Sequence, residues 1–212
     1  MAILIAPLLS SKYGIDINYI TPLLPVQILW INLVTDSLPA LALAFDPANK
    51  NIMERKPLKT SKGIFTKSMT FRIIYQGIMI GILTLAAFMI GLATTNTPID
   101  GLTLDESKIE VGQTMAFIVL ALSELVHVFN IRDNRKSIFK TGIFDNMKLI
   151  GAIIVSALLM LVILLVPVLR TIFSIPVLPT GNIVEVICLI FAPIVIVELF
   201  KLIGINSFED ED

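Results

Sequence analysis

The stretch Leu24–Pro39, LPVQILWINLVTDSLP, decides how this chain folds, because it is apolar enough to cross a membrane yet carries polar side chains in its middle. Asn32, Thr35 and Asp36 lie at positions i, i+3 and i+4, which share one face of a helix. An uncompensated Asp at the centre of a bilayer costs roughly 2.5 to 3.5 kcal/mol on insertion scales. A carboxylate at this depth therefore indicates a function, and the oxygen-rich face favours cation coordination.

Pro39 indicates that the helix is irregular beside this face. Proline has no amide hydrogen, so it cannot donate to the carbonyl of Thr35, and its ring disfavours helical geometry at Leu38. Freed carbonyls at membrane depth are tolerated only inside protein or beside a polar cavity, as in the broken helices of transporters. The sequence therefore predicts that the first full span is unwound near Asp36 to Pro39.

The composition places the whole chain in a membrane. Its 212 residues are 56% hydrophobic and 16% charged, and the basic residues show neither the excess nor the aromatic interleaving of a nucleic-acid-binding protein. We expect an all-α fold, a polytopic membrane helical bundle of five full spans, with residues 1–10 as the end of a partial helix that begins upstream. The predicted spans are 24–45, 71–94, 111–131, 149–168 and 183–203, and the predicted cytoplasmic loops are 46–70 and 132–148.

The orientation follows from the Lys and Arg residues, which gather in two loops. Seven of the 16 lie between Lys50 and Arg72, and five lie between Arg132 and Lys148. Cytoplasmic loops carry an excess of these residues, so we expect both loops and the acidic tail Glu209–Asp212 to be cytoplasmic. We expect the protein in the plasma membrane of a bacterium.

Glu124 is a second carboxylate at membrane depth, on a different predicted span. Two carboxylates in a dry interior cannot both stay ionised unless a cation or protons compensate them. Calcium takes six to eight oxygen ligands, and this chain would supply about six, with the rest from water or from segments outside the chain. The candidate ligands are Asn32, Thr35, Asp36 and Glu124.

Less specific interpretations compete at several positions. A protonated Glu124 could instead donate a hydrogen bond within the bundle, with His127 as its partner. For His127 itself, a packed and hydrogen-bonded side chain is more common than a ligand. Gly77 and Gly81 form a small-xxx-small pattern, which predicts close helix packing. Cys188, the single cysteine, is expected to be a small buried hydrophobe.

The run LPVQILWINLVTDSLPALALAFDP (24–47) resembles the sixth transmembrane helix of P-type cation-transporting ATPases of the calcium-pump type. NIMERKP (51–57) resembles the loop after that helix, and QTMAF (113–117) resembles the opening of the family's eighth helix. The resemblance covers essentially the whole chain and implies the C-terminal membrane domain of such a pump, from late in the fifth helix through the tenth. It implies that calcium is the transported ion and that Asn32, Thr35, Asp36 and Glu124 are its ligands in this chain.

The same resemblance implies a role for the loop after the first span. Asp46, Glu54 and Arg55 would form a docking surface that couples the phosphorylated domain to the membrane helices, whereas the alternative is a solvated linker whose lysines fix topology. His127 stands where the animal reticulum pumps have Asn. The run NLVTD differs from the sodium and potassium pumps at this point, which favours calcium.

No catalytic residue is assigned to this chain. It contains neither the Asp-Lys-Thr-Gly-Thr phosphorylation motif nor the Thr-Gly-Glu loop of the family. The fragment alone is therefore not expected to hydrolyse ATP, and ATP and magnesium would bind only to domains outside it. Its expected partners are the missing N-terminal membrane helices, the missing catalytic domains and the lipid bilayer. The alternatives are a stand-alone cation channel or carrier and a helical membrane-anchoring module.

Overall fold

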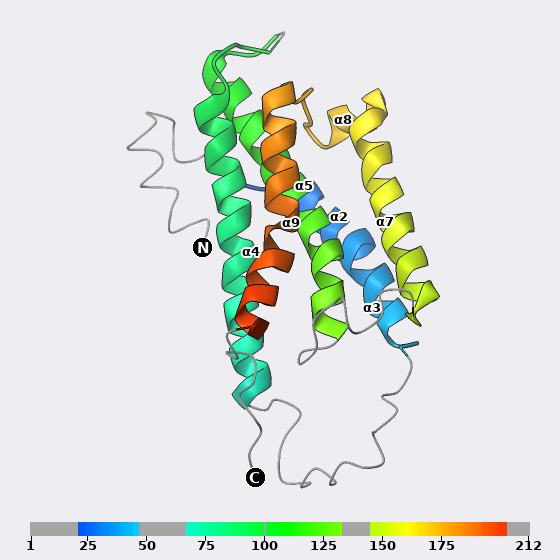
Figure 1. Cartoon of the computed structure of the whole chain (residues 1–212). Coiled ribbons are helices and arrows are strands. Elements are labelled where there is room, and N and C mark those ends of the chain that lie inside the picture. Colours follow the sequence, from blue (N-terminus) through cyan, green and yellow to red (C-terminus); the bar gives the residue numbers. More distant parts are fainter. Residues whose placement is uncertain (1–20, 47–66, 100, 133–144, 203–212) are drawn as a thin grey trace, which may run out of the picture.

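The computed structural model describes residues 21–46, 67–99, 101–132 and 145–202, and every element within them is a helix (Figure 1). The predicted partial helix at residues 1–10 and most of the two predicted loops lie outside the described residues. The elements are α2 (Pro25–Trp30), the π-helix η2 (Ile31–Asp36), α3 (Ser37–Leu43), α4 (Lys67–Thr94), α5 (Leu104–Arg132), α7 (Met147–Leu165), α8 (Pro167–Ile172) and α9 (Thr180–Leu202).

Five described stretches are long and apolar enough to cross a membrane, which confirms the predicted all-α bundle of five spans. The first span is composite, because α2, η2 and α3 follow one another without a break. The stretches are Pro25–Leu43, Met69–Thr94, Leu104–Ile131, Met147–Leu165 and Thr180–Leu202.

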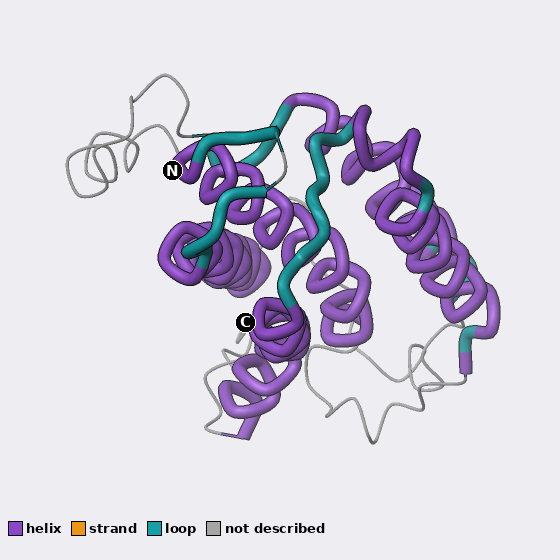
Figure 2. The backbone as a smooth tube through the Cα atoms, turned by 90° about the horizontal axis from the view of Figure 1, so that it is seen from above, coloured by secondary structure: helices purple, strands orange, loops and turns teal. Residues whose placement is uncertain are grey.

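The third span, α5, is the centre of the bundle. In its most apolar window 61% of the residues are buried, against 22% to 33% in the other four spans. It contacts α4 and α9 on one side and η2, α3 and α7 on the other (Figures 1 and 2). Met115, Phe117 and Val119 are fully buried on this helix and belong to the main hydrophobic core.

Helices α4 and α5 approach each other closely at a pair of glycines. A Cβ atom added to Gly91 would lie 2.6 Å from Gly112 Cα, and one added to Gly112 would lie 2.9 Å from Phe88 O. Neither position has room for a side chain. The packing predicted at Gly77 and Gly81 is not found among the described residues, because a Cβ added at either would meet no atom within 4 Å.

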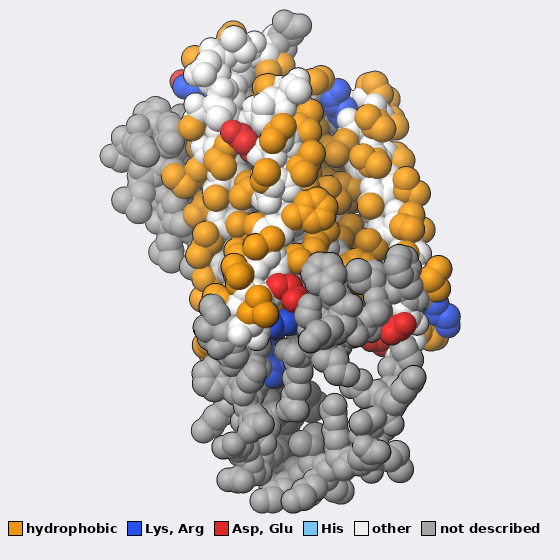
Figure 3. All heavy atoms as spheres, viewed as in Figure 1, with side chains coloured by type: hydrophobic (Ala, Val, Ile, Leu, Met, Phe, Trp, Pro, Cys, Tyr) orange, Lys and Arg blue, Asp and Glu red, His pale blue; other side chains and the backbone are white. Residues whose placement is uncertain are grey.

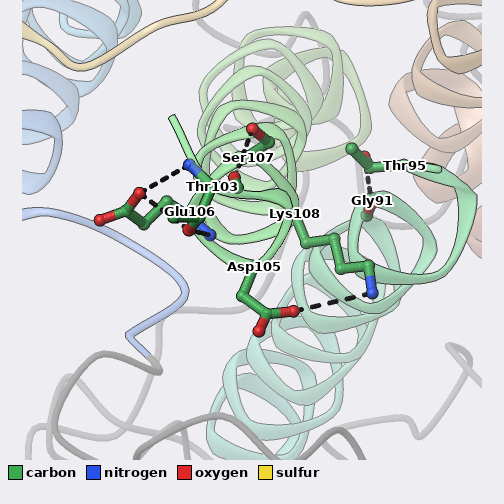
Figure 4. Close-up of polar contacts among 7 residues, drawn as sticks. All are labelled: Gly91, Thr95, Thr103, Asp105, Glu106, Ser107 and Lys108. Atoms are coloured by element: carbon green, nitrogen blue, oxygen red, sulfur yellow. Dashed lines mark hydrogen bonds and ion pairs between the residues drawn. The ribbon is translucent and has the colours of Figure 1, made fainter. Parts of the chain in front are cut away.

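Helix α5 begins at Leu104, well before the predicted start at residue 111, because its N-terminus is capped. Thr103 and Glu106 face each other there (Figure 4): Thr103 N donates to Glu106 Oε2 at 2.8 Å, and Glu106 N donates to Thr103 Oγ1 at 3.4 Å. This reciprocal pair is a capping box. The stretch between the predicted spans 71–94 and 111–131 therefore contains, in its second half, the first turns of α5.

Two buried glutamines tie the start of the first span to the rest of the bundle. Gln27 is fully buried, and its Nε2 donates to Phe173 O at 3.1 Å. Gln113 Nε2 on α5 donates to Thr21 O at 2.8 Å. Hydrogen bonds on two sides thus hold the start of the first span.

Hydrophobic side chains cover most of the described part of the face that Figure 3 shows. Exposed aliphatic residues are frequent on α7 and α9, and Leu158, Leu161, Val184 and Val195 are each about half exposed or more. Such a surface suits lipid, and the chain is a multi-pass membrane protein. Cys188 is exposed on α9, so the expectation of a buried cysteine is wrong.

Candidate functional site

The irregular part of the first span is a π-helix from Ile31 to Asp36. The sequence predicts unwinding near Asp36 to Pro39, whereas the structure places the irregularity one turn earlier and continues as the α-helix Ser37–Leu43. Pro39 is the third residue of α3, directly after the π-helix, so its missing amide hydrogen removes a possible donor for the carbonyls of η2. π-helical turns are often found at functional sites.

Two hydroxyl groups bond to carbonyls of this π-helix. Thr35 Oγ1 donates to Ile31 O at 2.7 Å, and Ser37 Oγ donates to Asn32 O at 2.8 Å. Thr35 is buried, with 2% of its surface exposed. Its hydroxyl hydrogen is used, but the oxygen keeps lone pairs that a cation could accept.

The structure brings together the two carboxyl groups that the sequence singles out. Asp36, at the end of η2, and Glu124, midway along α5, lie close enough for their carboxyl groups to interact. Glu124 Oε2 is buried and has no hydrogen-bond partner among the described residues. Two carboxyl groups this close require a proton or a cation between them. The pair therefore has the charge and the unused oxygen of a cation site.

Asn32 and Asp36 are exposed in the described chain, unlike Thr35. Both side chains are therefore accessible to further ligands. Within the described residues no group of three or more His, Cys, Asp or Glu side chains could hold a metal ion. The carboxyl pair alone therefore does not make up a metal site within the described residues.

His127 is a packed, hydrogen-bonded residue. It is 3% exposed, and its Nδ1 accepts a hydrogen bond from Asn130 Nδ2 at 3.2 Å. The same amide lies 3.4 Å from Pro193 O on α9. Within the described residues neither His127 Nε2 nor Glu124 Oε2 has a hydrogen-bond partner, so the alternative in which His127 is the partner of Glu124 gains no support.

Asn146 joins the far end of the first span to α7. Its Oδ1 caps α7 by accepting from Leu149 N at 3.0 Å, while its Nδ2 donates to Ala42 O at 3.2 Å and to Asp46 Oδ1 at 3.0 Å. The side chain is buried. Sequence reasoning missed this residue, although an Asn directly before an apolar run is a helix-start signal.

We expect Asn146→Ala to lower the free energy of unfolding by about 1 to 2 kcal/mol, because it removes a helix cap together with an interhelical hydrogen bond. Thermal denaturation of the purified protein in detergent measures this. Asn96→Ala is the matched control, since the exposed Asn96 amide bonds only to the nearby Thr94 O. Equal stability of the two variants would contradict the prediction.

Comparison with known proteins agrees with this architecture. Residues 20–203 match the family described as "Cation transporting ATPase, C-terminus". The chain belongs to this family. It is 38% identical over 208 residues to Calcium-transporting ATPase 1 of Bacillus cereus, which covers 92% of this chain and 23% of the relative. It is also 38% identical over 161 residues to the Calcium-transporting ATPase of Bacillus subtilis, covering 76% of this chain and 17% of the relative.

The family extends beyond bacteria. Calcium-transporting ATPase 3, endoplasmic reticulum-type, of Arabidopsis thaliana is 31% identical over 202 residues, covering 87% of this chain and 20% of that protein. The chain thus spans less than a quarter of the length of these relatives. The chain corresponds to the C-terminal membrane domain of this family.

Of the predicted coupling residues, the structure describes only Asp46. Its Oδ1 accepts from Asn146 Nδ2, so Asp46 sits where the first span ends and α7 begins. Glu54 and Arg55 lie outside the described residues. Lys148 contacts the first span at the same end of the bundle. Its Nζ lies 3.8 Å from the centre of the Phe45 ring.

Proposed function

We propose that this chain supplies half of the ion-binding site of an ATP-driven calcium pump. The observation that carries the proposal is the close approach of the Asp36 and Glu124 carboxyl groups, on two different spans. Hard cations such as calcium take oxygen ligands, and a pair of carboxylates compensates a divalent charge. The proposed ligands are Asn32, Thr35, Asp36 and Glu124.

The remaining ligands would come from membrane helices outside this chain. Asn32 and Asp36 are exposed, and their oxygens are open for coordination from that side. ATP and magnesium would bind to domains of the longer protein, and Asp46, Glu54 and Arg55 would couple those domains to the membrane. The family match and the names of the longer relatives favour a pump over a stand-alone channel, carrier or anchor.

The proposed orientation places the two basic loops in the cytoplasm, following the excess of Lys and Arg in them. The similarity to two Bacillus proteins supports a bacterial plasma membrane as the location. Calcium would then leave the cytoplasm through the face of the bundle that carries Asp36 and Glu124.

Measuring calcium binding to the full-length pump that carries Glu124→Gln tests the proposal. This change keeps the size of the side chain but removes its charge. We therefore expect the affinity for radioactive calcium to fall by more than about a hundredfold, which exceeds the loss typical of outer-shell residues. Glu185→Gln on α9 is the matched control and should bind as the wild type does. Unchanged binding by Glu124→Gln would remove Glu124 from the site.

A further inference from the structure

Ser156 is a buried hydroxyl on an otherwise almost wholly aliphatic helix. It lies on α7 with 0% of its surface exposed, and its Oγ donates to Val34 O at 3.1 Å. Val34 lies within the π-helix η2, between Asn32 and Asp36. The bond therefore joins α7 to the segment that carries the candidate ligands.

The Val34 carbonyl lacks one of its possible partners within the span. In a π-helix a carbonyl accepts from the amide five residues later, and the residue five positions after Val34 is Pro39, which has no amide hydrogen. At membrane depth no bulk water is present to replace the missing donor, and unpaired backbone groups there are costly. Ser156 supplies a donor from the neighbouring helix.

A second bond holds the same span to the same helix. Asn146, at the start of α7, donates to Ala42 O on α3. The two bonded carbonyls, of Val34 and Ala42, lie on opposite sides of Asp36 along the chain. α7 therefore fixes the first span at two points, and rotation of the segment that carries Asp36 is restricted between them.

We propose that Ser156 is a positioning residue of the cation site, holding the π-helix in the rotation that brings Asp36 to Glu124. The inference rests on the proposed function of that carboxyl pair. Ser156 does not touch the ion. It acts through the backbone of Val34, so its loss weakens ion binding without removing a ligand.

Ser156→Ala in the full-length pump separates this role from general stability. We expect the calcium concentration for half-maximal ATP hydrolysis to rise roughly threefold, the equilibrium factor that corresponds to an average interhelical hydrogen bond in a membrane. The maximal rate at saturating calcium should stay unchanged. Ser156→Thr, which keeps the hydroxyl, should restore the wild-type half-saturation.

The matched control is Thr84→Val on α4, because the Thr84 hydroxyl bonds only to Ile80 O of its own helix, at 2.9 Å. It should leave calcium half-saturation unchanged. Ser156→Ala with wild-type half-saturation would overturn the proposal, as would an equal shift in Thr84→Val. If Ser156→Ala does not accumulate as folded protein, Ser156→Cys replaces it. Its weak thiol donor should give an intermediate shift, and a wild-type value would again overturn the proposal.

Failure of the positioning role of Ser156 can be distinguished from failure of the proposed function. If Glu124→Gln binds calcium normally, the cation site itself is misplaced. If Glu124→Gln loses binding while Ser156→Ala keeps the wild-type half-saturation, the site stands and only the positioning role of Ser156 falls.

Discussion

Asp36→Asn in the full-length protein should abolish calcium-dependent phosphorylation from ATP. The change keeps the shape of the side chain but replaces one carboxylate oxygen with an NH₂ group. It thereby removes the negative charge, and the NH₂ group donates hydrogen bonds and cannot coordinate a cation. It also breaks the carboxyl pair with Glu124, which lies on the central helix of the bundle. We expect more than about a hundredfold loss of calcium sensitivity, because even outer-shell changes at metal sites cost 10- to 100-fold.

Measuring the phosphoenzyme that forms from labelled ATP across a calcium titration tests this prediction directly. Asp105→Asn is the matched control, because Asp105 is exposed near the start of α5 and is paired only loosely with Lys108 at 3.8 Å (Figure 4). It should phosphorylate at wild-type calcium concentrations. If Asp36→Asn responds to calcium as Asp105→Asn does, the first span does not carry the ion site.

The meeting of Asp36 and Glu124 was predictable because the membrane leaves few alternatives. A carboxyl group at that depth must find a proton, a cation or a partner, and the chain has two such groups midway along spans. The form of the helix break was harder to predict. Pro39 shows that a backbone bond is lost, but a π-helix upstream and an unwound segment downstream both accommodate that loss.

The contacts from α7 to the first span had no comparable signal. Ser156 is one hydroxyl in an aliphatic run, and its partner Val34 is 122 positions away in sequence. Hydrophobic periodicity identifies a span but not the face that meets another span. By contrast, the sequence does carry a signal for the early start of α5, because Thr103 and Glu106 have the spacing of a capping box. The predicted start at residue 111 overlooked this signal.

Glycine spacing likewise predicts a close contact without its location. Gly77 and Gly81 have the expected pattern, yet the close contact in the described chain is between Gly91 and Gly112, which lie on different helices. A pair of this kind cannot be recognised within one span. It depends on the crossing point of α4 and α5, which the tertiary structure sets.

Gly91→Val should destabilise the bundle by about 3 kcal/mol, at the upper end of the usual cost of overpacking. The added Cβ would lie 2.6 Å from Gly112 Cα and 2.8 Å from Gly112 N. Both are backbone atoms, so no side chain can turn aside, and the two helices must separate. Thermal denaturation in detergent measures the loss, and Gly151→Val, on an exposed face of α7 where an added Cβ meets nothing within 4 Å, is the matched control.

The same variant also tests how the cation site depends on the core. Glu124 and Gly112 belong to the same helix, so separation of α4 from α5 at Gly112 shifts the helix that carries Glu124 relative to Asp36. We therefore expect Gly91→Val to lose calcium affinity together with stability, whereas Ser156→Ala loses affinity with its maximal rate intact. If Gly91→Val is as stable as Gly151→Val, the close crossing of α4 and α5 is not present in the membrane.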